Sequence, residues 1–353
     1  MIDKINFRFE NDTFYGSFRN CVFRKKTEYN KVFSIASLNK NSNAQLWILK
    51  SLKNGRVRLV GSLRKWYYGE NSLLDFNKHS FIMALQRLAN TLDMSLSELG
   101  LGIISFFEIG LNIRTRIECT RLLKKICAYK SFYREDFYQN DGTLYFGYDK
   151  EKSKNSIRTI TIYDKCKEIA AKQEEQSTNI RKKKAFKIPK KHGYHFTRLE
   201  IKIKGKKSFK AMHLDNVNNL NSLIEKWNNL YVTWTFHVAK IYIAASLKYP
   251  PQMTRKERMI AELLERENFA SVIEKTLSKC TSETSDGLKA KRYRERRAIL
   301  DVILKYGDFS DYNTYTFKSD VALTLIRQCK KESKLSVGAF IRNLWKPSYT
   351  LLV

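Results

Sequence analysis

Several segments of this chain alternate apolar and polar side chains, the pattern of a β-strand with one buried face. In FTRLEIKIK, residues 196–204, three aliphatic residues alternate with charged ones, and Glu200 is the one acid on the basic side. In RTITIYDK, residues 158–165, two isoleucines alternate with Thr159, Thr161 and Tyr163. Such segments need a sheet with a core beneath it, so the sequence predicts a strand-rich fold.

Further strands are predicted between Ile5 and Tyr68, where Asn54-Gly55 separates two apolar runs and suits a tight hairpin. The run 104–113 reads as a buried strand with Glu108 in its middle. Helices are predicted at 77–92, where Asn77 is the N-cap, and at 120–137, and the segment 61–71 reads as a strand end and turn.

After Pro250-Pro251 the sequence pattern becomes helical, with predicted helices at 254–277, 288–306, 319–331 and 336–344. We therefore expect an α+β protein with three parts: a strand-rich N-terminal lobe at 1–100, a core at 101–250, and a helical accessory, DNA-binding domain at 251–353.

The charge of the chain points to a polyanionic partner. Lys and Arg number 66 against 35 Asp and Glu, which gives a formal net charge of +31. A surface of this kind binds phosphate backbones through counterion release. An anionic membrane is the competing partner, but no apolar run is long enough to span one. The N-terminus lacks the apolar region of a signal peptide, so we expect a cytoplasmic protein.

One tyrosine and four acids stand out against this basic background. Tyr163 is followed by Asp164 and Glu168, while Glu108 and Glu200 interrupt apolar strands. If these acids converge on one sheet face, their oxygens would suit Mg²⁺ or Mn²⁺. Each acid alone is already explained by a salt bridge or an exposed face. Together they predict a tyrosine nucleophile that attacks a metal-polarised phosphate, with Lys167 stabilising charge.

Cations and aromatic residues suggest where nucleic acid would bind. The segment GSLRKWYYGEN could stack bases, or it could be a turn with half-buried rings. The basic segment 178–195 could be a solvated loop, a flap over a DNA backbone, or both, and the stretch 289–297 could contact phosphates. The predicted DNA-binding residues are Arg64, Lys65, Trp66, Tyr67, Lys183, Lys184, Lys190, Lys191, Arg198, Lys202, Arg292 and Arg296.

The order of these pieces resembles a known family. GSLRKWYYGEN, FFEIGLNI, TLYFG, TITIYDKCKE and FTRLEIKIKG follow one another between Gly61 and Gly205. They resemble the gene II/X replication initiators of filamentous phages and related plasmid replication proteins, with a more distant likeness to the Rep-trans initiators of staphylococcal plasmids. The Y-D-K-x-x-E element followed by R-L-E-I is the specific part. The resemblance covers a little over a third of the chain and leaves out the region beyond Pro250.

The resemblance implies an antiparallel-sheet catalytic core of the rolling-circle-initiator type. It implies an endonuclease that nicks one strand of a supercoiled origin, stays linked to the 5′-phosphate through Tyr163 and leaves a free 3′-hydroxyl. Glu108, Glu168 and Glu200, with Asp164, would hold Mg²⁺ or Mn²⁺. The implied partners are origin DNA, both supercoiled duplex and single strand, together with a host helicase and a single-strand-binding protein, and the chain could act as a homodimer.

Two other classes of protein fit parts of the sequence. A tyrosine recombinase also forms a phosphotyrosine, but it needs no metal and carries its tyrosine near the C-terminus, whereas Tyr163 lies mid-chain among acids. A non-enzymatic origin-binding or transcription protein would rely on the basic stretch at 289–297. Nicking that depends on a divalent metal separates the first reading from both.

Overall fold

The computed structural model describes residues 1–39, 42–129, 132–133, 142–147, 157–177, 195–243, 246–266, 276, 279–282, 284–308, 312–330, 332 and 337–345. The predicted DNA-binding residues Lys183, Lys184, Lys190 and Lys191 lie outside these ranges.

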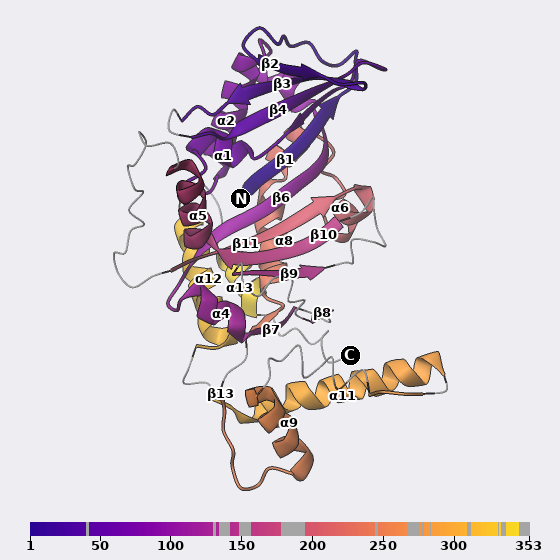
Figure 1. The fold of residues 1–353 in the computed structure, drawn as a ribbon, viewed down its shortest axis with the longest axis vertical. Coiled ribbons are helices and arrows are strands. Elements are labelled where there is room, and N and C mark those ends of the chain that lie inside the picture. The colour runs from indigo at the N-terminus through magenta and orange to yellow at the C-terminus, as the bar shows by residue number, and fades with distance from the viewer. Residues whose placement is uncertain are drawn as a thin grey trace.

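The centre of the fold is a nine-stranded antiparallel sheet with the strand order β2-β3-β4-β5-β1-β6-β11-β10-β9 (Figure 1). Together with the helices it confirms the predicted mixed α+β class. The strands are β1 (Ile2–Phe9), β2 (Val22–Lys26), β3 (Asn30–Ala36), β4 (Gln45–Ser51), β5 (Val57–Val60), β6 (Ile103–Thr115), β9 (Thr143–Gly147), β10 (Ile157–Asp164) and β11 (His195–Lys204). Two small sheets are formed by β7 (Ile126–Tyr129), β8 (Phe132–Tyr133) and β12 (Ile241–Ile243), and by β13 (Ser246–Leu247) and β14 (Gly307–Asp308).

Local sequence signals explain where several elements begin and end. Gly55 lies in the β4–β5 hairpin with φ +67°, a backbone conformation that favours glycine, as predicted. Asn77 caps α2 by accepting a hydrogen bond from the Ser80 amide, also as predicted. Ser95 forms a capping box with Glu98 at the start of α3.

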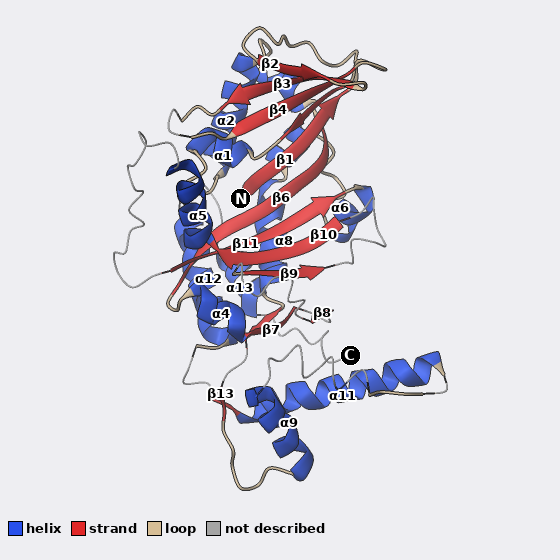
Figure 2. Cartoon of the chain, viewed as in Figure 1, coloured by secondary structure: helices blue, strands red, loops and turns tan. Residues whose placement is uncertain are grey.

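The helices follow the sequence prediction in part (Figure 2). They are α1 (Leu63–Tyr68), α2 (Lys78–Thr91), α3 (Leu96–Gly100), α4 (Cys119–Lys125), α5 (Lys165–Ser177), α6 (Lys206–Ala211), α7 (Leu220–Glu225), α8 (Trp227–Val238), α9 (Arg255–Arg266), α11 (Ser285–Tyr306), α12 (Thr314–Cys329) and α13 (Val337–Trp345). The predicted helix at 120–137 is wrong, because the chain leaves α4 at Ile126 and enters β7. The predicted turn at 61–71 is instead largely the short helix α1, which Ser62 caps.

Helices cover one face of the large sheet, and we call the opposite face, which has no described helix across β1, β6 and β11, the open face. Helices α8 and α12 pack against β6, and α13 packs against both of these helices. Figure 1 shows α8, α12 and α13 behind the sheet, and no described helix crosses the near face of β1, β6 and β11 in that view. The covered face carries the apolar side chains of the strands, including Phe107, Ile109, Leu199 and Ile201, in one continuous core. Polar groups are therefore left to the open face.

The predicted parts of the chain are joined more closely than expected. Strand β1 pairs with both β5 and β6, so residues 1–100 and 101–250 share one sheet. Beyond residue 250, α9 and α11 lie apart from that sheet (Figure 1), whereas α12 and α13 return to its covered face. Within the described ranges, no helix combines the length and the apolar character that crossing a membrane requires.

Candidate active site

The open face brings the predicted site residues into cross-strand rows. Because directly paired residues project to the same side of a sheet, the register of β10, β11 and β6 fixes which side chains are neighbours. The three rows are Tyr163–Arg198–Asn112, Thr161–Glu200–Gly110 and Thr159–Lys202–Glu108. The sequence prediction that Tyr163, Glu108 and Glu200 share one sheet face is confirmed.

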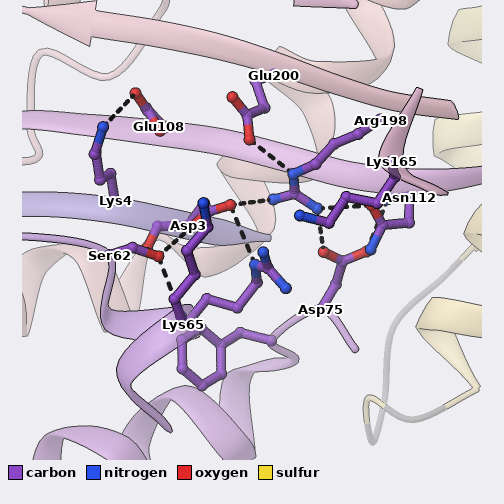
Figure 3. Close-up of polar contacts among 12 residues, drawn as sticks. Asp3, Lys4, Ser62, Lys65, Asp75, Glu108, Asn112, Lys165, Arg198 and Glu200 are labelled. Atoms are coloured by element: carbon purple, nitrogen blue, oxygen red, sulfur yellow. Dashed lines mark hydrogen bonds and ion pairs between the residues drawn. The ribbon is translucent and has the colours of Figure 1, made fainter. Parts of the chain in front are cut away.

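Arg198 is the hub of this face (Figure 3). Its guanidinium is fully buried and donates to Glu200 Oε1 (2.7 Å), Asp75 Oδ1 (2.7 Å), Asn112 Oδ1 (3.0 Å) and Asp3 Oδ2 (2.8 Å). Burial alone would lower the pKa of Arg198, but Asp75 and Asp3 raise it well above its usual value. The prediction that Arg198 contacts DNA is therefore wrong, because its side chain is committed to an internal ion network.

Two of the predicted DNA contacts on α1 are internal as well. Arg64 and Trp66 are fully buried. Arg64 donates to Asp3 Oδ2 at 3.1 Å and to two backbone carbonyls, and the Trp66 indole donates to the carbonyl of Ala36. Tyr67 is half-buried, and Arg87 lies 5.0 Å from its ring centroid. The aromatic and basic side chains of this segment therefore stabilise the fold. Of the predicted residues of α1, Arg64 joins the internal ion network through Asp3, and Lys65 reaches Glu168.

Tyr163 is half-buried at the edge of this network. Its hydroxyl donates to Glu200 Oε1 at 3.0 Å, the same oxygen that accepts from Arg198. Burial and the neighbouring Glu200 carboxylate raise the pKa of Tyr163 well above its usual value. The phenol therefore stays protonated near neutral pH, so attack by its oxygen needs a proton acceptor. Glu200 is the acceptor already in place.

Two lysines bind Glu168 on α5. Lys165 is fully buried, donates to Glu168 Oε2 and lies 5.9 Å from the Tyr163 ring centroid. Lys65 donates to the other Glu168 oxygen at 3.0 Å. Burial, with Arg64 and Arg198, lowers the pKa of Lys165 to about 7. Lys167, the predicted catalytic lysine, is exposed, so the geometry favours Lys165 for that role.

The predicted metal ligands are only partly gathered. Glu108 and Glu200 are diagonal neighbours on β6 and β11. Asp164 instead accepts from the amides of Cys166 (2.9 Å) and Lys167 (3.0 Å), so it caps α5. Glu168 is occupied by its two lysines. In the described part of the chain, no three His, Cys, Asp or Glu side chains are grouped closely enough to hold a metal ion.

The remaining pair still has features that suit a divalent cation. Glu108 is buried, and burial together with Glu200 raises its pKa to about 7. The hydroxyl oxygen of Thr161, directly opposite Glu200, is buried without a hydrogen-bond partner among the described residues. Two repelling carboxylates beside an unsatisfied hydroxyl form a set of hard oxygen donors. These residues therefore fit a Mg²⁺ or Mn²⁺ ion that needs further ligands from water or substrate.

Glu108 makes stability depend on pH. Its folded pKa of about 7 lies above the ordinary 4.5, so its contribution is complete below pH 4.5 and is lost as pH rises through 7. This loss amounts to roughly 3 kcal/mol. We expect Glu108→Gln to gain stability relative to wild type between pH 5 and pH 8 in metal-free denaturant titrations. The exposed Glu225→Gln is the control, and a Glu108→Gln profile parallel to wild type would contradict the assignment.

Gly110 makes room for the ion network. A Cβ at this position would lie 2.8 Å from Arg198 Nη2 and 3.0 Å from Glu200 Cγ. We expect Gly110→Ala to push both side chains out of place and to cost about 1–3 kcal/mol of unfolding free energy. Gly338→Ala is the control, because the added Cβ would have Arg342 Nη1 at 3.9 Å as its nearest contact. Equal melting temperatures for wild type and Gly110→Ala would refute this role.

Two acids of the site were missed from the sequence. Asp3 on β1 and Asp75 before α2 both bind Arg198. A signal existed for Asp3, since the apolar residues Ile2 and Ile5 are spaced by three rather than two, which marks the register shift seen between them. No comparable pattern marks Asp75. Of the other predicted DNA contacts, Lys202 lies 31% exposed on the open face, Arg292 is exposed on α11, and Arg296 belongs to the same helix.

No family model matches the chain, and no match was found among curated proteins or among solved structures.

Proposed function

We propose that this chain is a metal-dependent nicking enzyme that cleaves one strand of an origin DNA through Tyr163. The observation that carries the proposal is the 3.0 Å hydrogen bond from the Tyr163 hydroxyl to Glu200 on the open face of the sheet. A half-buried phenol with a carboxylate acceptor, next to the cations of α1 and α5, is suited to attack a phosphodiester.

The proposed step transfers a phosphoryl group to the protein. The Tyr163 oxygen attacks phosphorus while its proton passes to Glu200. The P–O3′ bond breaks, and the electron pair leaves with the 3′-oxygen, which takes up a proton and becomes a free 3′-hydroxyl. The new ester links Tyr163 to the 5′-phosphate and keeps the energy of the broken bond, so the same centre can rejoin the strand by the reverse step.

The other residues of the site have supporting roles in this proposal. Arg198 donates to Glu200 Oε1 and so holds this carboxylate against the Tyr163 hydroxyl. The Lys165 ammonium, with a pKa lowered to about 7, is a suitable proton donor for the departing 3′-oxygen. Glu168 accepts from both Lys165 and Lys65, and the two ammonium groups form a cation-rich corner that favours negative charge on the phosphate.

Glu108 and Glu200, with the Thr161 hydroxyl, are the residues that would hold Mg²⁺ or Mn²⁺. The ion, when bound, would polarise the scissile phosphate. This assignment replaces the predicted set that included Asp164 and Glu168. Rolling-circle replication from a nicked origin, with a host helicase and a single-strand-binding protein as partners, rests on the family resemblance. The proposed cytoplasmic location rests on the N-terminal sequence, which does not resemble a signal peptide.

The proposal is tested with supercoiled DNA that carries the candidate origin. We expect incubation with Mg²⁺ or Mn²⁺ to give an open circle with protein attached, and EDTA to prevent it. Nicking that persists in EDTA supports a tyrosine recombinase instead. Specific binding without any nick supports a non-enzymatic origin-binding protein, and either result overturns the proposal. Thermal shift gives a second readout, since Mn²⁺ should raise the melting temperature of wild type but not of Glu108→Gln.

A further inference from the structure

The open sheet face continues well beyond the residues around Tyr163. Trp47 lies on β4 and pairs with Val60 on β5. Farther along the sheet, Asn6 pairs with Phe106, which in turn pairs with Lys204. Five strand spacings separate β4 from β10, about 24 Å at about 4.8 Å each. The face therefore offers a surface of several nucleotides' length.

Two positively charged side chains on this face lie opposite one another, although they repel each other. Arg8 and Arg58 are directly opposite one another on β1 and β5, and both are exposed. Like charges in such a pair destabilise a sheet. Glu10 contacts Arg8 at 3.5 Å, but it also pairs with Arg56. An external polyanion would offset this repulsion.

A second basic group lies between Arg8 and the candidate active site. Lys4 is 51% exposed and Lys202 is 31% exposed, and each reaches Glu108 only at 3.9 Å. Both ammonium groups thus remain open to solvent on the same face, with Lys204 nearby on β11. Basic side chains thus lie on β5, β1 and β11 of the same face.

Exposed aromatic surface accompanies the cations. Trp47 is 40% exposed although large aromatic side chains are usually buried, and Phe106 is half-buried in the middle of the face. Rings that lie among cations can stack on bases, but a base offers its face only when it is unpaired. This favours a single strand over a duplex as the occupant.

We propose that the open sheet face, defined by Trp47, Arg58, Arg8, Phe106, Lys4 and Lys202, binds single-stranded DNA and guides it toward Tyr163. The inference rests on the proposed function for its direction, and it adds a binding surface that the chemistry at Tyr163 does not need. Bases stack on Trp47 and Phe106, and phosphates lie against the arginine pair and the lysines.

The test measures binding without cleavage. Full-length Tyr163→Phe protein in EDTA is titrated against a labelled single-stranded oligothymidylate, and fluorescence anisotropy is followed at several salt concentrations. We expect Arg8→Ala/Arg58→Ala to weaken binding about tenfold and to reduce the salt slope by roughly 1.4, since each contacted phosphate contributes about 0.7. Trp47→Ala should weaken binding about fivefold or more.

Matched controls lie on the opposite face. Lys26 and Lys31 also face one another across two strands and are exposed, so Lys26→Ala/Lys31→Ala removes a similar charge pair. Lys31 neighbours Val32 along β3, while Trp47 pairs with Ser34, which places Lys31 on the other side. Tyr29→Ala, which removes a 68% exposed ring in the β2–β3 turn, is the aromatic control. These variants should bind as the parent does.

The proposal is overturned if the arginine pair and Trp47 can be replaced without loss of affinity for single-stranded DNA. It is also overturned if the control variants lose as much of this affinity. The same holds if the arginine-pair and Trp47 variants impair only the binding of a duplex of the same length. The result is independent of the nicking reaction. If single-stranded DNA binds as expected but origin DNA is not nicked, only the proposed function is contradicted. If origin DNA is nicked but the variants bind single-stranded DNA normally, only this inference is contradicted.

Discussion

Replacing Arg198 with methionine should unfold much of the protein or destabilise it by about 3–5 kcal/mol. The side chain is fully buried and binds Glu200, Asp75 and Asp3. Without it, three carboxylates would remain inside the protein with no shared cation, and the loss of one partner of a buried network has a cost of this size. Urea titration of both proteins at pH 7 measures the difference.

Two comparisons test whether the effect at Arg198 comes from its buried charge. Arg297→Met removes an exposed arginine whose ion pair to Asp301 is 3.9 Å long, and it should change stability by less than about 1 kcal/mol. Arg198 lowers the pKa of Asp75 against the effect of burial, so this acid stabilises the wild type above pH 4. In Arg198→Met the same acid favours protonation, and the gap to wild type should narrow at pH 4. An equal gap at pH 4 and pH 8 would contradict the network.

Glu200→Gln should slow nicking by about 10²- to 10⁴-fold, the usual contribution of a positioned general base. The amide keeps the shape of the side chain and a hydrogen-bond partner for Tyr163, but it cannot accept the phenolic proton. Single-turnover nicking of supercoiled origin DNA at saturating protein measures the rate of the chemical step.

A matched variant separates this effect from simple loosening of Arg198. Asp75→Asn also removes a carboxylate from Arg198, but Asp75 makes no contact with Tyr163 among the described residues. We expect Asp75→Asn to lower stability and to slow nicking far less than Glu200→Gln. If the two variants slow the reaction equally, Glu200 acts through the arginine and not as the proton acceptor.

Strand periodicity predicted much of the sheet because it depends on local alternation. The pattern of 196–204 placed Glu200 on the open face, and β10 placed Tyr163 beside it, so the pairing of Thr161 with Glu200 followed once the strands met. The helix at 120–137 failed because β-strand pairing with β12 overrides local propensity at Ile126. Pairing between strands so far apart in the chain cannot be recognised from the local sequence.

Side-chain environment was harder to predict than secondary structure. Arg64, Trp66 and Arg198 belong to residue types that often bind nucleic acid, and sequence alone assigned them to DNA. Asp3 binds both arginines and Asp75 binds Arg198, and these acids lie far from their partners along the chain. No local pattern therefore indicated that the two arginines are neutralised internally. Because these side chains are buried and paired internally, we now propose nucleic-acid contacts on the open sheet face and not on α1.

The most direct measurement of the central claim is the identity of the residue that becomes linked to DNA. Origin DNA labelled at the phosphate of the nick is incubated with protein and Mn²⁺, digested with protease and nuclease, and the labelled peptide is sequenced by mass spectrometry. We expect a 5′-phosphotyrosyl adduct on Tyr163 and no adduct from folded Tyr163→Phe protein. A covalent complex in Tyr163→Phe, or an adduct on another residue, would contradict the account.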